Sequence, residues 1–127
     1  MKRTGRIRPK PSERRDAERE ALSEAREVVY RRSRGRCEVC GGVGAEFSHR
    51  RTRAVRGQHQ NAPENALWAC RTCHARMHRN PEVARANGWH VSRYVDDPGT
   101  VPVWLPPRSG WFLLGRDGSL TPTGAPE

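Results

Sequence analysis

Apolar residues in the first third of the chain recur at the spacing of one helix face. They form a single narrow stripe, Ala21, Leu22, Ala25, Val28 and Val29. The opposite face is a mixture of Glu and Arg, which water solvates well. Acidic residues just after Ser12 suit a first helical turn, and Gly35 supplies the left-handed residue that often ends a helix. The pattern predicts a charged amphipathic helix from about Ser12 to Arg32.

Shorter elements follow in the middle of the chain. Residues 46–49 place Phe47 and His49 on one face if they are extended. Residues 72–79 have the pattern of a helix, and Asn80-Pro81-Glu82 is a strong start for a second short helix that ends near Asn87-Gly88. Residues 89–94 alternate loosely, as a strand would.

The last 32 residues have a different character, with V-P-V-W-L-P-P and W-F-L-L followed by G-R-D-G. These are typical of strands and a hairpin that turns at residues 115–118. We therefore expect an α+β fold and three segments. Residues 1–12 form a disordered basic arm, residues 13–95 a domain with an N-terminal helix, and residues 96–127 a C-terminal extension with a β-hairpin.

All four cysteines lie in two C-x2-C pairs, Cys37/Cys40 and Cys70/Cys73, with 29 residues between the pairs. Gly41-Gly42 follows the first pair, and small residues there let backbone amides turn toward the thiolates. Four thiolates suit a closed tetrahedral structural Zn2+. The expected contribution to folding is on the order of 10 kcal/mol, which is comparable to the whole stability of a small domain.

Composition supports zinc over disulfides. Only 34% of the residues are hydrophobic, so a chain of 127 residues has little apolar material for a core. The N-terminus has no apolar run after its basic residues, which argues against a signal peptide, and no stretch approaches a membrane span. We expect a cytoplasmic protein with no membrane partner, in which paired C-x2-C motifs are zinc ligands.

The formal net charge of +10 is distributed unevenly. Residues 1–36 carry 13 basic and 6 acidic groups, residues 37–95 carry 9 and 4, and residues 96–127 carry 2 and 4. All but two of the 24 basic residues are arginines, whose planar fork binds phosphate with two hydrogen bonds. A GC-rich genome also favours arginine. Concentration of positive charge beside the cysteines nevertheless indicates a nucleic-acid partner.

Two histidines, His74 and His78, follow the second cysteine pair with the i, i+4 spacing of one helix face. Such a pair can hold one divalent ion. Alternatively, His78 caps the helix or packs with Met77, and the pair alone does not decide between these interpretations.

The order C-x2-C, His, Asn, C-x2-C-H resembles the HNH endonucleases over about residues 30–80. The flanking sequences R-x-R-G-R-C-E-V-C-G and N-A-L-x-A-C-x-x-C-H strengthen the resemblance. It is greatest to small bacteriophage HNH proteins found near packaging genes, whose tails often carry G-W-x-V-S-R, an Asp-Pro and a W-x-L-L hairpin. The resemblance implies a ββα-metal domain (His-Me finger, treble-clef-like), stabilised by the zinc.

The resemblance also implies roles for particular residues. His49, Asn65 and His74 occupy the three name-giving positions. His49 is expected to be the general base, since a histidine with an ordinary pKa near 6.5 suits that task at neutral pH. Asn65 is expected to tie the loop so that His49 keeps its orientation. His74 and His78 are expected to bind a catalytic divalent ion such as Mg2+ or Mn2+.

One position departs from the family pattern. Many members have Asp or His just before the base, where it binds the metal, whereas this chain has Ser48. Ser48 is therefore a weak candidate ligand that His78 could compensate. His59 is expected in a solvent-exposed loop, with a substitute base or phosphate contact as the alternative, and His90 is expected to be structural.

The arginine-rich loop after the base is expected to clamp flanking phosphates with four side chains, Arg50, Arg51, Arg53 and Arg56. The function that these expectations favour is a metal-dependent DNA endonuclease that acts as a monomer. The alternatives are a catalytically silent zinc module that binds nucleic acid, and a packaging adaptor with terminase subunits as partners. A binding module would need the cysteines and arginines but not His49, Asn65 and His74 in register.

Overall fold

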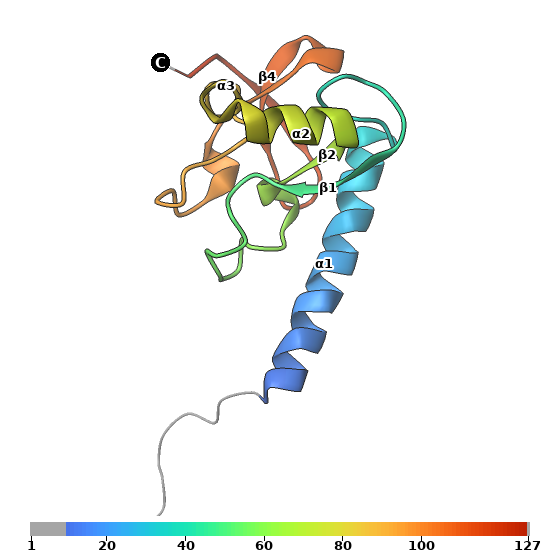
Figure 1. The fold of residues 1–127 in the computed structure, drawn as a ribbon, viewed down its shortest axis with the longest axis vertical. Coiled ribbons are helices and arrows are strands. Elements are labelled where there is room, and N and C mark those ends of the chain that lie inside the picture. Colours follow the sequence, from blue (N-terminus) through green and yellow to red (C-terminus); the bar gives the residue numbers. More distant parts are fainter. Residues whose placement is uncertain (1–9, 127) are drawn as a thin grey trace, which may run out of the picture.

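The computed structural model describes residues 10–126 and has the α+β class that the sequence predicts. Figure 1 shows one long helix that leads into a body of small antiparallel sheets and short helices. The elements are α1 (Pro11–Ser33), β1 (Ala45–His49), β2 (Ala66–Cys70), α2 (Arg71–Arg79), α3 (Pro81–Ala86), β3 (Val103–Leu105), β4 (Gly110–Leu114) and β5 (Leu120–Thr123). Single-turn 3-10 helices lie at Pro63–Asn65, Pro98–Thr100 and Pro106–Arg108.

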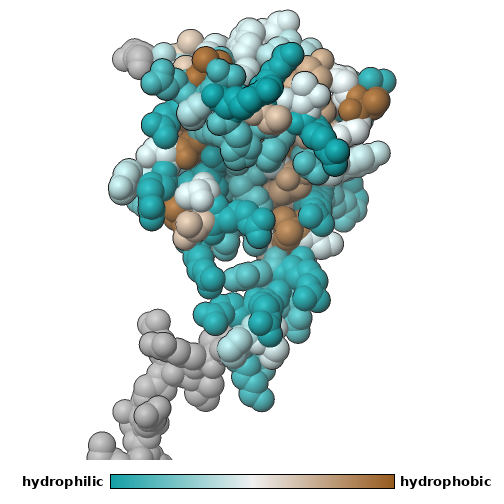
Figure 2. Space-filling view, viewed as in Figure 1, coloured by the Kyte–Doolittle hydropathy of each residue, from teal (hydrophilic) through white to brown (hydrophobic). Residues whose placement is uncertain are grey.

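Helix α1 begins at Pro11, one residue before the predicted start, because proline suits the first helical position. It ends with Arg34 and Gly35 both at positive φ, and the Gly35 N–H donates to the Tyr30 carbonyl at 3.0 Å. Its buried residues, Ala25, Val29 and Arg32, belong to the C-terminal half. The N-terminal half projects from the body with a hydrophilic surface (Figures 1 and 2). Of the predicted arm at residues 1–12, residues 1–9 lie outside the described residues.

A buried ion pair joins α1 to the rest of the molecule. Arg32 Nη2 lies 2.7 Å from Glu38 Oε1, and the two side chains are only 1% and 3% exposed. Arg32 also donates to the carbonyls of Pro63 and Ala66, and the Trp68 N–H donates to Glu38. Both charges are thus paired and their remaining hydrogen-bonding groups are satisfied, which a buried pair requires. The pair fixes the end of α1 against β2 and the residue next to Cys37.

Strands β1 and β2 form an antiparallel hairpin, and α2 follows β2 without a linker. The register pairs Ala45 with Cys70 and His49 with Ala66. Helix α2 begins at Arg71, one residue before the predicted start, with the Cys70 sulfur as its N-cap acceptor. Chain order and pairing therefore place the end of β1 beside the helix that carries His74 and His78.

The predicted strand at residues 89–94 is wrong, because these residues form bends and turns without strand pairing. The N–H groups of Trp89 and His90 both donate to the Ala84 carbonyl, and that of Val91 donates to the Arg50 carbonyl. The chain enters this segment through Gly88 at φ 73°, where a Cβ atom would lie 1.9 Å from the Pro102 oxygen. Only glycine can occupy that position.

The C-terminal segment forms a three-stranded antiparallel sheet, β3–β4–β5, with the predicted hairpin turn at residues 115–118. Its side chains share a core with β2. The buried members of that cluster are Leu67, Val103, Leu105 and Leu114, with Trp89 packed against them. The predicted extension at 96–127 therefore packs directly on the predicted domain. Among residues 10–126, no helix has the length and apolar composition needed to cross a membrane.

Candidate metal centres and active site

The four cysteines meet at one point, as the sequence predicts. Their Sγ atoms all lie within 4.8 Å of one another, and Cys40 Sγ is 3.7 Å from Cys70 Sγ. Backbone N–H groups point at the sulfurs at 3.4 Å, including Cys40 and Val39 to Cys37 and Cys73 to Cys70. All four are free thiols. This geometry can hold a structural metal such as zinc.

Electrostatics at the cysteines favour a cation. The Cys73 N–H lowers the pKa of Cys70 to about 7, so this thiol loses its proton more readily than an ordinary cysteine does. Burial raises the pKa of Cys73, since it lies in the interior with the other sulfurs around it. Four sulfurs this close cannot all be thiolates without a compensating charge. A divalent ion supplies that charge, so metal binding should release protons from the cluster.

A separate pocket of about 620 Å³ lies beside β1 and α2. It gathers four of the five histidines, His49, His74, His78 and His90. Four arginines, Arg50, Arg53, Arg85 and Arg93, also line it, and no Asp or Glu does among the residues that the structure describes. A positively charged, histidine-rich hollow of this kind is suited to an anionic ligand.

His49 stands at the end of β1 and is half-buried. Its Nε2 lies 2.9 Å from Asn61 Oδ1. Because an amide oxygen only accepts, Nε2 carries the proton and Nδ1 keeps a free lone pair. Burial lowers the pKa of His49, with a smaller lowering from the positive charge of Arg53, while the Asn61 hydrogen bond opposes the shift. The ring is therefore neutral at pH 7 and able to accept a proton at Nδ1.

His74 and His78 share one face of α2, one turn apart, as predicted. Their Nε2 atoms are 3.1 Å apart and their ring centres 4.6 Å apart. On the opposite side of the His74 ring, Nδ1 lies 3.0 Å from Ser48 Oγ. Ser48, which the sequence suggests as a weak metal ligand, is buried and faces the nitrogen of His74 that points away from His78.

Asn65 is fully buried and holds the loop that follows β1. Its Oδ1 accepts from the Arg51 N–H at 2.7 Å, its Nδ2 donates to the Gln60 carbonyl at 3.0 Å, and its carbonyl accepts from the Arg50 N–H at 2.7 Å. These contacts close the loop between residues 50 and 65. With these contacts Asn65 can hold the two ends of the loop together, although it does not line the pocket itself.

The prediction that Arg50 and Arg51 clamp phosphates is wrong, because both are buried at 2% and 3% exposure. Arg50 donates to four carbonyls, those of Glu64, Gly88, Pro98 and Val101. Arg51 donates to the carbonyls of Val95 and Asp96. Burial lowers the pKa of Arg50 to about 9, which still leaves the guanidinium charged at neutral pH. Both cations are internal braces.

Arg53 and Arg56 are exposed, and of the two only Arg53 lines the pocket. The structure adds Arg85 from α3 and Arg93, which the sequence analysis did not single out. It also moves His90 into the pocket, where its ring centre is 5.3 Å from that of His78. The sequence analysis missed this position of His90 because it predicted a strand at residues 89–94. In the structure a turn after α3 folds His90 back toward α2.

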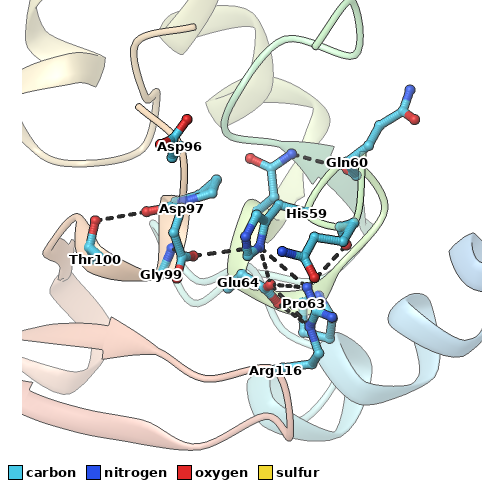
Figure 3. A network of polar contacts seen from close by, with 12 residues as sticks. His59, Gln60, Pro63, Glu64, Asp96, Asp97, Gly99, Thr100 and Arg116 are labelled. Carbon is cyan, nitrogen blue, oxygen red and sulfur yellow. Dashed lines mark hydrogen bonds and ion pairs between the residues drawn. The ribbon is translucent and has the colours of Figure 1, made fainter. Parts of the chain in front are cut away.

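His59 is not in a solvent-exposed position, contrary to expectation. Its Nδ1 lies 2.7 Å from Glu64 Oε2, and the side chain is 18% exposed (Figure 3). Asp97 Oδ1 is 3.5 Å from the same nitrogen. Three potential ligands thus converge, but the Arg116 guanidinium lies 2.7 Å from Glu64 Oε2 and already supplies the positive charge. This network fastens the loop to the β4–β5 turn, away from the histidine pocket.

Comparison of the chain with protein-family models, with curated proteins and with solved structures found no match in any of the three.

Proposed function

We propose that this protein is a metal-dependent endonuclease of the HNH type that hydrolyses DNA phosphodiester bonds. The observation that carries the proposal is the convergence of His49, His74 and His78 on one pocket that arginines surround. A β-hairpin followed at once by a helix brings them together, and the four-cysteine cluster stands at the junction of strand and helix. This is the arrangement expected of a ββα-metal domain.

In the proposed reaction, His49 is the general base. With its proton on Nε2 toward Asn61, Nδ1 can take a proton from a water molecule. The oxygen of that water attacks phosphorus, and the bond from phosphorus to the leaving oxygen breaks. The lowered pKa of His49 keeps the base unprotonated at neutral pH, before a substrate is bound.

His74 and His78 would hold the catalytic ion, with nitrogen atoms on adjacent turns of α2. The ion, when bound, supplies positive charge for the developing oxyanions of the phosphate. Ser48 holds the His74 ring from one side, and the rigid helix α2 carries both rings.

Arg53, Arg85 and Arg93 would bind the phosphates on either side of the scissile bond. They replace the buried Arg50 and Arg51 in this role. Contacts of this kind position the duplex without reading its sequence, so no base preference follows from them. A role in phage DNA packaging, with terminase subunits as partners, rests on the family resemblance alone.

One observation favours a second candidate, a zinc module that binds nucleic acid without cutting it. The position where the family often has Asp or His is occupied by Ser48, whose Oγ is engaged with His74. The pocket therefore lacks a carboxylate that Mg2+ would prefer.

A plasmid assay separates the two candidates. We expect the zinc-loaded protein to nick supercoiled DNA with Mg2+ or Mn2+, and His49→Ala to lower the rate by about 10²- to 10⁴-fold. Glu46→Ala, on an exposed position of the same strand, is the matched control and should cut normally. Tight DNA binding without nicking under either ion would favour the binding module. Undiminished cutting by folded His49→Ala would remove His49 as the base.

A further inference from the structure

The most exposed large apolar side chain among residues 10–126 is Tyr94, which is 87% accessible to solvent. It lies in a turn at residues 92–95, directly after Arg93, which lines the histidine pocket. The Arg93 Cζ atom is 5.9 Å from the centre of the Tyr94 ring. Single exposed apolar side chains are common and need no explanation by themselves. Tyr94 differs from these because it stands beside the pocket on a backbone that is fixed from two sides.

Hydrogen bonds close the turn and fasten the residue that precedes it. The Val95 N–H donates to the Ser92 carbonyl at 3.1 Å, and the Tyr94 N–H donates to Ser92 Oγ at 3.3 Å. Just before the turn, the Val91 N–H donates to the Arg50 carbonyl at 2.9 Å. The turn is therefore tied to the loop that follows β1, which forms another part of the pocket lining.

Buried Arg51 fastens the other end of the turn. Its Nη1 donates to the carbonyls of Val95 and Asp96 at 2.7 Å and 2.6 Å. Its Nε is also buried and has no hydrogen-bond partner among residues 10–126. A buried cation with an unsatisfied N–H destabilises a fold. Such local costs are typical of places where function requires a fixed geometry, and here the fixed element is the turn that carries Tyr94.

An exposed aromatic ring beside an arginine suits one class of ligand. Proteins that bind single-stranded nucleic acid combine cationic groups for the phosphates with aromatic rings on which the bases stack. The Arg93 guanidinium is within cation–π distance of one face of the Tyr94 ring, and the high exposure of the side chain leaves the other face open. Bases inside a duplex are already stacked on their neighbours, so only a base that has left the stack can use that face.

The charge around Tyr94 favours a nucleic acid over an apolar protein partner. Arg53, Arg85 and Arg93 are exposed where they line the adjoining pocket, and no Asp or Glu lines it among residues 10–126. A protein partner held by the ring alone would have to lie against this uncompensated positive charge. A strand of nucleic acid offers a phosphate for every base, so the same ligand satisfies both the arginines and the ring.

We propose that Tyr94 stacks on an unpaired base while Arg93 binds a phosphate of the same strand, so that the pocket takes DNA with at least one base outside the duplex. The inference rests on the proposed function in placing DNA at this pocket. It names the substrate class as single-stranded DNA or the junction between a duplex and a single strand. Every base has a face on which a ring can stack, so the selection is for DNA structure and not for sequence.

The test is DNA binding by the zinc-loaded full chain, in buffer without added divalent ions so that the DNA stays intact. Fluorescence anisotropy compares a single-stranded oligonucleotide with a blunt duplex of the same sequence. Tyr94→Ala should weaken binding of the single strand at least about fivefold, whereas binding of the duplex should change by less than about twofold. Tyr94→Phe, which keeps the ring, should bind both as the wild type does. A single strand that contains 2-aminopurine should lose fluorescence on binding to the wild type and to Tyr94→Phe, but not to Tyr94→Ala.

Val43→Ala, at an apolar side chain that is 75% exposed and outside the pocket, is the matched control and should bind both DNAs normally. Unchanged binding of the single strand by Tyr94→Ala, or equal losses for single strand and duplex, would overturn the inference and leave the nuclease proposal intact. An equal loss in Tyr94→Phe would overturn it too, because the hydroxyl and not the ring face would make the contact. Tyr94-dependent binding of single strands by a protein that never nicks plasmid would instead support the stacking site and defeat the proposed function.

Discussion

Asn61 Oδ1 lies 2.9 Å from His49 Nε2, so the proton of the proposed base is directed away from the pocket. The contact spans the loop between β1 and β2, whose ends Asn65 ties together. Loop closure and base orientation are therefore linked. Several consequences can be measured.

The rate of DNA nicking should depend on pH through His49. Burial lowers the pKa of this histidine below its ordinary 6.5, so the neutral form, which the proposed reaction requires, persists to mildly acidic pH. The rate should be level near neutrality and fall as pH decreases through an apparent pKa below 6.5.

Asn61→Asp should move this fall in rate to a higher pH, because a carboxylate beside Nε2 stabilises the imidazolium form of His49 and so raises its pKa. Asn61→Ala removes the hydrogen bond and should lower the maximal rate about tenfold or more, through loss of orientation. If the rate of Asn61→Asp falls at the same pH as that of the wild type, a group other than His49 controls the pH dependence.

Loss of one cysteine should unfold the protein. Cys70 is both a candidate zinc ligand and the N-cap acceptor of α2, so Cys70→Ser is expected to abolish zinc retention and cooperative folding. A structural zinc site can contribute on the order of 10 kcal/mol, which matches the whole stability of a small domain. Zinc content by elemental analysis and thermal melting by circular dichroism measure the two effects.

The control is Thr72→Ser, an exposed position between the two cysteines, which should keep its zinc and its melting temperature. A Cys70→Ser protein that stays folded and fully loaded with zinc would contradict a structural role for the cluster.

Sequence patterns predicted the elements that depend on local signals. The Asn-Pro helix start, the hairpin turn at 115–118 and the cysteine cluster are all present, because a proline in the first helical turn, glycine conformations and ligand spacing act over a few residues. Residues 89–94 had no such signal. Their path is set by carbonyls from α3 and from Arg50, contacts that alternation in the sequence does not encode.

The arginines illustrate the same limit at the site. Arg50, Arg51, Arg53 and Arg56 look alike in the sequence, yet two are internal braces and two are exposed. The two buried arginines differ from the two exposed ones because they meet carbonyl acceptors from segments up to 51 residues away. Burial of an arginine depends on tertiary acceptors, so charge patterning alone could not divide the group.

Arg50→Met should destabilise the protein severely. The change would leave four carbonyls without their donor, and each unsatisfied buried group costs about 1–3 kcal/mol. We expect a loss of at least about 3 kcal/mol in the free energy of unfolding, measured by urea denaturation. Arg56→Met, at an exposed position on the same loop, should change it by less than about 0.5 kcal/mol. Equal stabilities would show that Arg50 does not brace the fold.

Single alanine substitutions of Arg53, Arg85 and Arg93 should weaken DNA binding without loss of stability. Each should reduce the slope of log affinity against log salt by about 1, as removal of one phosphate contact does. Fluorescence anisotropy with a short duplex, at several salt concentrations, measures this slope. Arg56→Ala is the comparison, since Arg56 is exposed but outside the pocket, and its effect should be smaller. A larger loss of DNA affinity in Arg56→Ala than in the pocket variants would show that the duplex binds elsewhere on the surface.

Stability at acid pH should depend on Glu64. Burial alone would raise the pKa of this carboxyl, but hydrogen bonds from Arg116 and His59 outweigh it and hold the pKa below its ordinary 4.5 (Figure 3). A lowered pKa in the folded state means that the unfolded chain binds the proton more readily. The contribution is therefore complete above pH 4.5 and is lost as pH falls through the lower, folded value.

Arg116→Ala removes the strongest partner of Glu64. The free energy of unfolding of this variant should therefore decrease less steeply as pH falls. Because Arg116 is half exposed, its share at neutral pH should be only about 1 kcal/mol. Urea unfolding between pH 3 and pH 7 (about the range of carboxyl titration) should show wild type and variant converging at the acid end. Arg108→Ala, an exposed arginine outside this network, should keep the wild-type pH dependence. Parallel curves for wild type and Arg116→Ala would show that Glu64 does not fasten the loop through its charge.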